Sequence, residues 1–123
     1  MTSFVRVLIA DDDPLFIEAL EAILGIESEI EVAGRANDGE EATRLAGELE
    51  PDVVLMDLSM PVLDGFEASR RIRAEAPTTT VVVLTGSSYA EDVKKAYDAG
   101  ASGYVTKHRI AQDLVRTVLD AVN

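Results

Sequence analysis

The chain has 123 residues, a length typical of a single globular domain. Hydrophobic residues make up 47% of it, so it can bury a sizeable core, and it contains no cysteine. A disulfide framework, a thiolate metal site and a cysteine nucleophile are therefore excluded. The net charge of −12 gives a surface that repels nucleic acid and anionic lipid, so we expect this domain to bind neither directly.

The sequence also bears on location. The longest apolar runs are too short to span a bilayer, and Met1–Arg6 lacks the basic region and long apolar stretch of a signal peptide. The absence of cysteine is compatible with a reducing compartment. We therefore expect a cytoplasmic protein.

Short apolar runs alternate with longer segments of helical period along the whole chain. The predicted strands are Phe4–Ala10, Ile30–Arg35, Asp52–Met56, Thr80–Leu84 and Ser102–Thr106. The third and fourth contain continuous apolar runs rather than alternating ones, as do strands buried on both faces of a parallel sheet. Because parallel strands need crossover helices, the pattern predicts a doubly wound α/β domain of five βα units.

The predicted helices differ in the strength of their apolar faces. In the first, which Pro14 begins and Gly25 stops, the apolar face consists of Leu15, Ala19, Ala22 and Ile23. Asn37 or Asp38 caps the second helix, and Asp64 caps the third. The inward residues of the second and third helices are Ala42, Leu45, Leu49, Phe66, Ala68 and Ile72.

The last two predicted helices contrast with each other. The segment Tyr89–Ala99 is short and polar, so we expect a shallowly packed, mobile helix. The segment Ile110–Val122 carries a full apolar stripe, made of Leu114, Val115, Val118 and Leu119.

Charged residues follow three of the predicted strands directly. Asp11 and Asp12 follow the first strand, Asp57 the third and Lys107 the fifth. The carboxyl ends of parallel strands meet at one edge of the sheet, which is where ligands bind in such folds. Two carboxylates about 4 Å apart repel by about 4 kcal/mol at an effective dielectric near 20, and a hard cation such as Mg²⁺ offsets this repulsion. The cluster predicts a Mg²⁺ site that handles phosphate, with Asp57 able to attack phosphorus.

Each of these residues has a simpler interpretation when it is taken alone. The acidic run Asp11–Asp13 is typical of a helix N-cap, a role we expect of Asp13. A single lysine such as Lys107 is usually solvated. His108 is the only histidine, so it cannot build a metal site with a second histidine or a cysteine, and we expect a surface loop residue. The prediction of a Mg²⁺ and phosphate site therefore rests on finding the acidic residues and the lysine together at one edge of the sheet.

The loops after the third and fourth strands complete the candidate site. Thr85 ends the fourth strand, where its hydroxyl can donate to a phosphoryl oxygen. Gly86 and the serines after it form a polar loop. Met60–Pro61 and Asp64–Gly65 favour a sharp turn that places the backbone of Ser59 near the acidic cluster.

Together these motifs resemble the receiver domain of a two-component response regulator, from one end of the chain to the other. The matching motifs are Asp11–Asp12, Asp57 followed by Met60–Pro61 and Asp64–Gly65, Thr85, and Gly100–Tyr104 leading to Lys107. The resemblance implies a flavodoxin-like fold with five helices and strand order 2-1-3-4-5. It also implies that residues 1–123 are one receiver domain, with no output domain in this chain.

The resemblance implies a role for each residue of the site. Asp57 would accept a phosphoryl group from a sensor histidine kinase, with Mg²⁺ as cofactor. Asp12 would ligate the Mg²⁺ directly, Asp11 through water, and Ser59 through its carbonyl. The phosphoryl group would contact Thr85, Gly86 and Lys107. Tyr104 would be the aromatic switch that turns inward as Thr85 shifts, and Ser59 and Ser87 would tune dephosphorylation.

Three stretches, Asp12–Phe16, Pro51–Leu58 and Arg70–Ala74, are similar to those of NarL/LuxR-type receivers. Receivers of this type usually precede a helix-turn-helix DNA-binding domain. The sequence leaves open whether the chain is a stand-alone receiver or part of a longer protein. Phosphorylation would control dimerisation or an output such as transcription, and the only catalysis expected is of the domain's own phosphorylation and dephosphorylation.

The sequence departs from the usual receiver pattern at two positions, and two alternative functions have to be considered. His108 stands where many receivers have proline, which puts a cis peptide there in doubt. Asp13 stands where this type often has histidine. An aspartyl phosphatase would usually carry an acid at the position of Ser59. An interaction module that works without phosphorylation would be expected to lose an acidic residue or Lys107, yet all are present.

Overall fold

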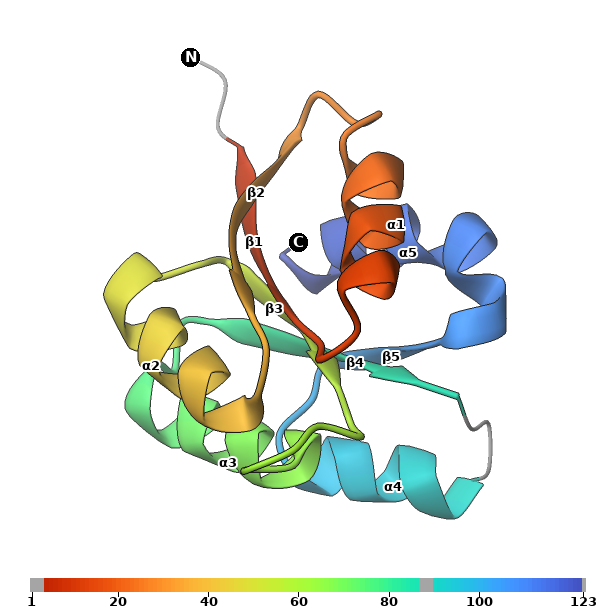
Figure 1. Cartoon of the computed structure of the whole chain (residues 1–123). Helices are drawn as coiled ribbons and strands as arrows, with labels where there is room; N and C mark the ends of the chain where they lie inside the picture. Colours follow the sequence, from red (N-terminus) through yellow and green to blue (C-terminus); the bar gives the residue numbers. More distant parts are fainter. Residues whose placement is uncertain (1–3, 87–89, 123) are drawn as a thin grey trace.

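A computed structural model describes residues 4–86 and 90–122 of the chain. In it these residues form five parallel strands in one sheet, in the order β2-β1-β3-β4-β5 (Figure 1). The strands are β1 (Val5–Ala10), β2 (Ile30–Ala36), β3 (Val53–Asp57), β4 (Thr80–Thr85) and β5 (Gly103–Thr106). The predicted fold class and strand order are confirmed.

Helices cover both faces of the sheet. They are α1 (Pro14–Leu24), α2 (Gly39–Leu49), α3 (Gly65–Glu75), α4 (Ala90–Asp98) and α5 (Ile110–Ala121). One face is covered by α1 and α5, and the other by α2, α3 and α4 (Figure 1). A short 3₁₀ helix, η1 (Lys107–Arg109), joins β5 to α5 and was not predicted. No helix in the described ranges is long and apolar enough to cross a bilayer.

Aspartates start three of the helices as predicted. The side chains of Asp13, Asp38 and Asp64 accept hydrogen bonds from backbone amides at the starts of α1, α2 and α3. Of the two candidates for the second cap, the structure selects Asp38, which accepts from the amide of Glu41 at 2.8 Å. Each cap satisfies a donor that a helix start leaves without an intrahelical partner.

The continuous apolar runs are explained by burial on both faces. Along β1, Val7 and Ile9 face the core cluster under α1 and α5, whereas Leu8 and Ala10 face the cluster under α2, α3 and α4. Successive side chains of a strand point to opposite faces, so both sets have to be apolar when helices cover the sheet on both sides.

The predicted apolar face of α1 is wrong. Leu15 is 76% exposed, and Ala19 and Ala22 are exposed as well. The buried residues are instead Ile17, Leu20 and Leu24. The physical reason is size, because burying two leucines and an isoleucine removes more apolar surface from water than burying one leucine and two alanines. Ile23 alone of the predicted set packs against the core.

The two helices that flank β5 differ as predicted. Three large side chains of α5, Ile110, Leu114 and Val118, are buried. On α4, Ala96 is the one buried residue among positions 91–98. Since positions 91–98 of α4 contribute a single fully buried methyl group, less apolar burial holds this part of α4 to the sheet than holds α5.

Candidate phosphoacceptor and metal site

The sheet register brings the charged residues together. Ala10 of β1 pairs with Met56 of β3, so Asp11 and Asp57, the next residue of each chain segment, leave the sheet side by side. On the other side of β4, Thr85 pairs with Thr106 of β5. Lys107 follows Thr106 and therefore leaves β5 at the same edge.

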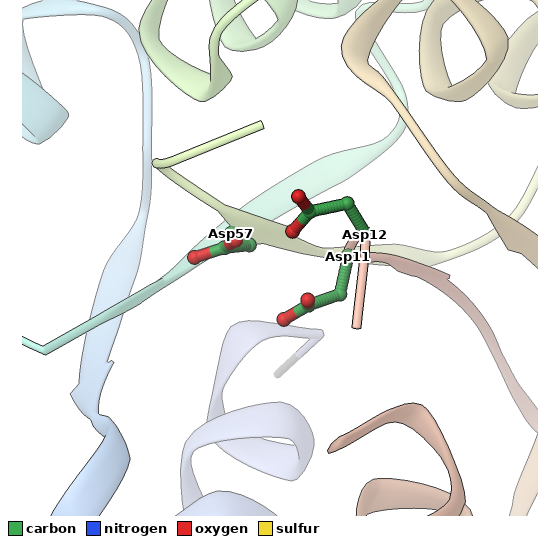
Figure 2. A group of neighbouring side chains, drawn as sticks. All are labelled: Asp11, Asp12 and Asp57. Atoms are coloured by element: carbon green, nitrogen blue, oxygen red, sulfur yellow. The ribbon is translucent and has the colours of Figure 1, made fainter. Parts of the chain in front are cut away.

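Three carboxylates converge at this edge. Asp11, Asp12 and Asp57 each offer an oxygen, and these atoms lie within 4.8 Å of one another. Figure 2 shows Asp11 and Asp12 leaving the end of β1 beside Asp57 at the end of β3. Asp11 is fully buried and Asp57 is 3% exposed, whereas Asp12 is exposed to solvent. Two of the three charges are thus held away from water, where their repulsion is poorly screened.

Lys107 is the cation of the cluster. Its Nζ lies 3.1 Å from Asp57 Oδ1 and 3.5 Å from Asp11 Oδ2. Burial would lower the pKa of Lys107, but the carboxylates of Asp57 and Asp11 outweigh it and raise the pKa above its usual value. The side chain therefore stays an ammonium at neutral pH.

One oxygen of Asp11 is only weakly paired by the described residues. Its Oδ1 accepts a hydrogen bond from the Asp13 amide at 2.9 Å. Its Oδ2 is buried and accepts no well-formed hydrogen bond from the described residues; the Lys107 ammonium lies 3.5 Å away as a long ion pair. Burial raises the pKa of Asp11, the Asp13 amide opposes that shift, and the Asp57 charge adds to it. A buried carboxylate oxygen that has only one long ion pair leaves room for a further cation or a water to bind it.

The donor set fits a hard divalent cation. Three carboxylates and one ammonium sum to a charge of −2. All the offered atoms are carboxylate oxygens, which Mg²⁺ prefers. Asp11, Asp12 and Asp57 could therefore hold such an ion.

A close contact fixes the backbone of Asp57. The Gly65 amide donates to the Leu58 carbonyl at 3.2 Å, so the start of α3 lies against the end of β3. A Cβ on Gly65 would come 2.4 Å from the Asp57 carbonyl oxygen. Only glycine fits this position, which is why the predicted turn needs it.

Two of the three predicted phosphate contacts, Thr85 and Gly86, line a cleft beside this edge with the predicted metal ligand Ser59, whereas Lys107 is not among its lining residues. Ser59, Thr85 and Gly86 border a cleft of about 340 Å³, together with Leu58, Phe66 and Asp92. Thr85 is 7% exposed, and Ser59 and Gly86 are exposed. The cleft starts one residue past Asp57 and separates the β3–α3 loop from α4. Ser87, Ser88 and Tyr89 lie outside the described residues.

Tyr104 lies apart from the carboxylates. Its side chain is 37% exposed and packs edge to face on Tyr97 of α4, with ring centroids 6.3 Å apart. The pair joins β5 to α4. The structure therefore holds the predicted switch residue on the helix that is least buried.

Sequence reasoning missed Phe16. The Nζ of Lys107 lies 4.5 Å from the centroid of the Phe16 ring. A signal was present, because Phe16 falls in the first turn of a helix that begins directly after the acidic run. His108 is exposed in η1 as expected, and the peptide that joins it to Lys107 is trans.

Known proteins resemble this chain over nearly its whole length. Residues 7–119 match the family model of the response regulator receiver domain. The transcriptional regulatory protein LnrK of Bacillus subtilis is 36% identical over 115 residues, which are 94% of this chain and 52% of LnrK. The response regulator VraR of Staphylococcus aureus is 37% identical over 93% of this chain and 54% of VraR. The chain thus spans about half the length of these curated relatives.

Solved structures agree with the sequence matches. The receiver domain of the response regulator NarL from Mycobacterium tuberculosis aligns with a TM-score of 0.93 and 32% identity, covering 98% of this chain and 97% of that one. A LuxR-family response regulator from Aurantimonas aligns with a TM-score of 0.92 and 34% identity, covering 98% and 86%. The family, the fold and the strand-end carboxylates lead to one conclusion: this chain belongs to the receiver domain family of two-component response regulators.

Proposed function

We propose that this domain accepts a phosphoryl group on Asp57 from the phosphohistidine of a sensor histidine kinase, with Mg²⁺ as cofactor. The observation that carries the proposal is the pairing of the buried Asp57 carboxylate with Lys107 at 3.1 Å, beside the buried carboxylate of Asp11, which lies 3.5 Å from the same ammonium. Structural packing alone gives no reason to bury two carboxylates together.

The chemistry is a phosphoryl transfer between two side chains. A carboxylate oxygen of Asp57 forms a bond to phosphorus as the bond from phosphorus to the imidazole nitrogen of the kinase breaks, and the imidazole leaves with the electron pair. Asp11, Asp12, Asp57 and the Ser59 carbonyl would hold Mg²⁺, which when bound supplies positive charge against the carboxylates and the phosphoryl oxygens.

Lys107 and Thr85 act on the transferred group. Once Asp57 is an acyl phosphate, its carboxyl group no longer carries the charge that attracts the Lys107 ammonium, and the phosphoryl oxygens become the stronger partner. Thr85 closes β4 beside the cleft, where its hydroxyl can donate to another phosphoryl oxygen. Gly86 allows the backbone to approach the same group closely.

We infer that phosphorylation then biases a conformational switch. Thr85 moves toward the phosphoryl group, α4 shifts, and Tyr104 turns inward. Two observations support this: α4 buries little, and Tyr97 and Tyr104 link it to β5. The output would be a change in dimerisation or partner binding. In a longer protein with a helix-turn-helix domain, the output would be control of transcription by a cytoplasmic regulator.

Intact mass after incubation with acetyl phosphate tests the proposal. The wild type should gain one phosphoryl group with Mg²⁺ and none without it, and Asp57→Asn should gain none. A phosphoryl adduct on Asp57→Asn would show that a residue other than Asp57 accepts the phosphoryl group. An unmodified wild type that also fails to bind beryllofluoride with Mg²⁺ would overturn the proposal in favour of an interaction module that works without phosphorylation.

A further inference from the structure

The ammonium of Lys107 lies between two carboxylates and an aromatic ring. Asp57 and Asp11 contact it at 3.1 and 3.5 Å, and the centroid of the Phe16 ring lies 4.5 Å from the same Nζ. The carboxylates come from the ends of β3 and β1, and the ring comes from the first turn of α1. Lys107 keeps 32% of its side chain exposed, so these contacts, rather than complete burial, restrict where the ammonium can go.

The ring is itself held firmly. Phe16 packs against the core cluster under α1 and α5. Its neighbours mark the boundary of that core, since Leu15 is 76% exposed and Ile17 is 2% exposed. The Asp13 cap fixes the start of α1 by accepting from the Leu15 amide at 3.0 Å. Phe16 therefore presents its ring to Lys107 from a rigid place.

A ring differs from the other side chains that could stand here. An aliphatic side chain would remove water from the ammonium and offer no attraction in return. A carboxylate would attract it strongly and compete with the phosphoryl oxygens. A ring face attracts a cation within about 6 Å of its centroid but carries no net charge. It can hold the ammonium near Asp57 and leave its charge available.

We propose that Phe16 is a positioning residue for Lys107, one that confines the ammonium to the space beside Asp57 and sets how fast Asp57 is phosphorylated. This inference rests on the proposed function. When the Asp57 carboxylate loses its charge on phosphorylation, its contact with Lys107 weakens and the ring contact remains. Phe16 thus keeps Lys107 in reach of the phosphoryl oxygens during the exchange of partners.

Paired variants separate the ring from its bulk. Phe16→Leu keeps an apolar side chain and removes the π face, whereas Phe16→Tyr keeps the face. With acetyl phosphate and saturating Mg²⁺, Phe16→Leu should lower the rate of Asp57 phosphorylation about threefold to tenfold, and Phe16→Tyr should stay within about twofold of wild type. The surface control Leu15→Ala, one residue away, should leave the rate unchanged. Circular dichroism and urea titration establish that each variant is folded.

A second readout does not depend on phosphorylation. The ring current of Phe16 should shift the ε-methylene protons of Lys107 upfield in the NMR spectrum of the Mg²⁺-free protein. The shift should disappear in Phe16→Leu and persist in Phe16→Tyr. Absence of the shift in the wild type would overturn the contact.

The outcomes distinguish this inference from the proposed function. Equal rates in wild type and Phe16→Leu, or an equal loss in Phe16→Tyr and Phe16→Leu, would overturn the positioning role while phosphorylation of the wild type stands. A wild type that shows the ring-current shift but gains no phosphoryl group would overturn the proposed function and the positioning role, and leave only the contact.

Discussion

The helices on either side of β5 hold to the sheet in different ways. α5 buries Ile110, Leu114 and Val118, all large and aliphatic. α4 buries Ala96 among the described side chains and otherwise relies on contacts at the surface. These are the edge-to-face pair of Tyr97 with Tyr104 and the Lys95 ammonium, 4.8 Å from the centroid of the Phe66 ring.

This difference in packing between α5 and α4 matches the different roles that we propose for the regions next to them. Lys107 lies in η1, which runs directly into the firmly packed α5, and Asp11 precedes α1, which packs on the same face. The groups proposed for chemistry are therefore fixed by large buried side chains. α4 borders the cleft beside Thr85 through Asp92. The element that we propose to shift on phosphorylation is therefore the lightly packed helix.

Truncating one residue on each helix should give the largest contrast. Leu114→Ala should lower the free energy of unfolding by about 2 to 5 kcal/mol, because it leaves a cavity in the core. Ala96→Gly should cost about 1 kcal/mol, mostly from helix propensity. Urea titration of the two variants gives the values. Losses of equal size would remove the asymmetry between α5 and α4.

Neutralising Asp11 should have an effect whose sign depends on Mg²⁺. Asp11→Asn should raise the free energy of unfolding in Mg²⁺-free buffer by about 1 to 3 kcal/mol, because it removes a buried charge that repels Asp57. It should remove most of the stabilisation that Mg²⁺ gives the wild type. Thermal unfolding with and without Mg²⁺ measures both, and an Asn variant that Mg²⁺ stabilises as much as wild type would contradict the metal assignment.

Lowering the pH should stabilise the Mg²⁺-free protein, as neutralising Asp11 by substitution should. The folded-state pKa of Asp11 lies above its unfolded value, because burial disfavours the charge. Ionisation of Asp11 therefore lowers the free energy of unfolding at pH values above its folded-state pKa. The Mg²⁺-free wild type should regain this free energy as the pH falls through the folded-state pKa toward the unfolded-state pKa. The gain should be absent in Asp11→Asn when the two proteins are titrated side by side in urea at a series of pH values.

Removing the ring pair should have the smallest effect on stability. Tyr97→Leu should cost about 0.5 to 1.5 kcal/mol, the usual worth of an aromatic pair beyond its buried area. It should also shift the Tyr104 ring signals in NMR toward those of the beryllofluoride-bound wild type, because the outward position of Tyr104 loses a contact. Tyr97→Phe keeps the ring and should behave as wild type. Tyr104 signals unchanged in Tyr97→Leu would count against a role for the pair in the switch.

Much of the fold could be predicted from the sequence because its strands leave little choice. Runs such as those of β3 and β4 are buried on both faces, as is typical of a parallel sheet covered by helices. The sheet in turn brings together Asp11, Asp57 and Lys107, since each directly follows or ends a strand. The roles assigned to these residues stay predictions.

What could not be predicted depends on rotation and packing. α1 carries apolar residues on both flanks of Glu18 and Glu21, so periodicity alone does not say which flank is buried. In the structure, the buried flank is the one that carries the larger side chains of Ile17, Leu20 and Leu24. The contact of Phe16 with Lys107 was missed for the same reason, because it depends on how α1 is turned about its axis.

Hydrogen–deuterium exchange with and without beryllofluoride and Mg²⁺ tests the central claim most directly. Beryllofluoride mimics the phosphoryl group on Asp57, and the measurement compares wild type with Asp57→Asn. We expect exchange to change in the wild type over residues 90–106, which hold α4 and β5, and to stay the same over residues 110–121 of α5. We expect no change in Asp57→Asn. Equal changes in α4 and α5, or a response in Asp57→Asn, would contradict a switch that runs from Asp57 to the lightly packed helix.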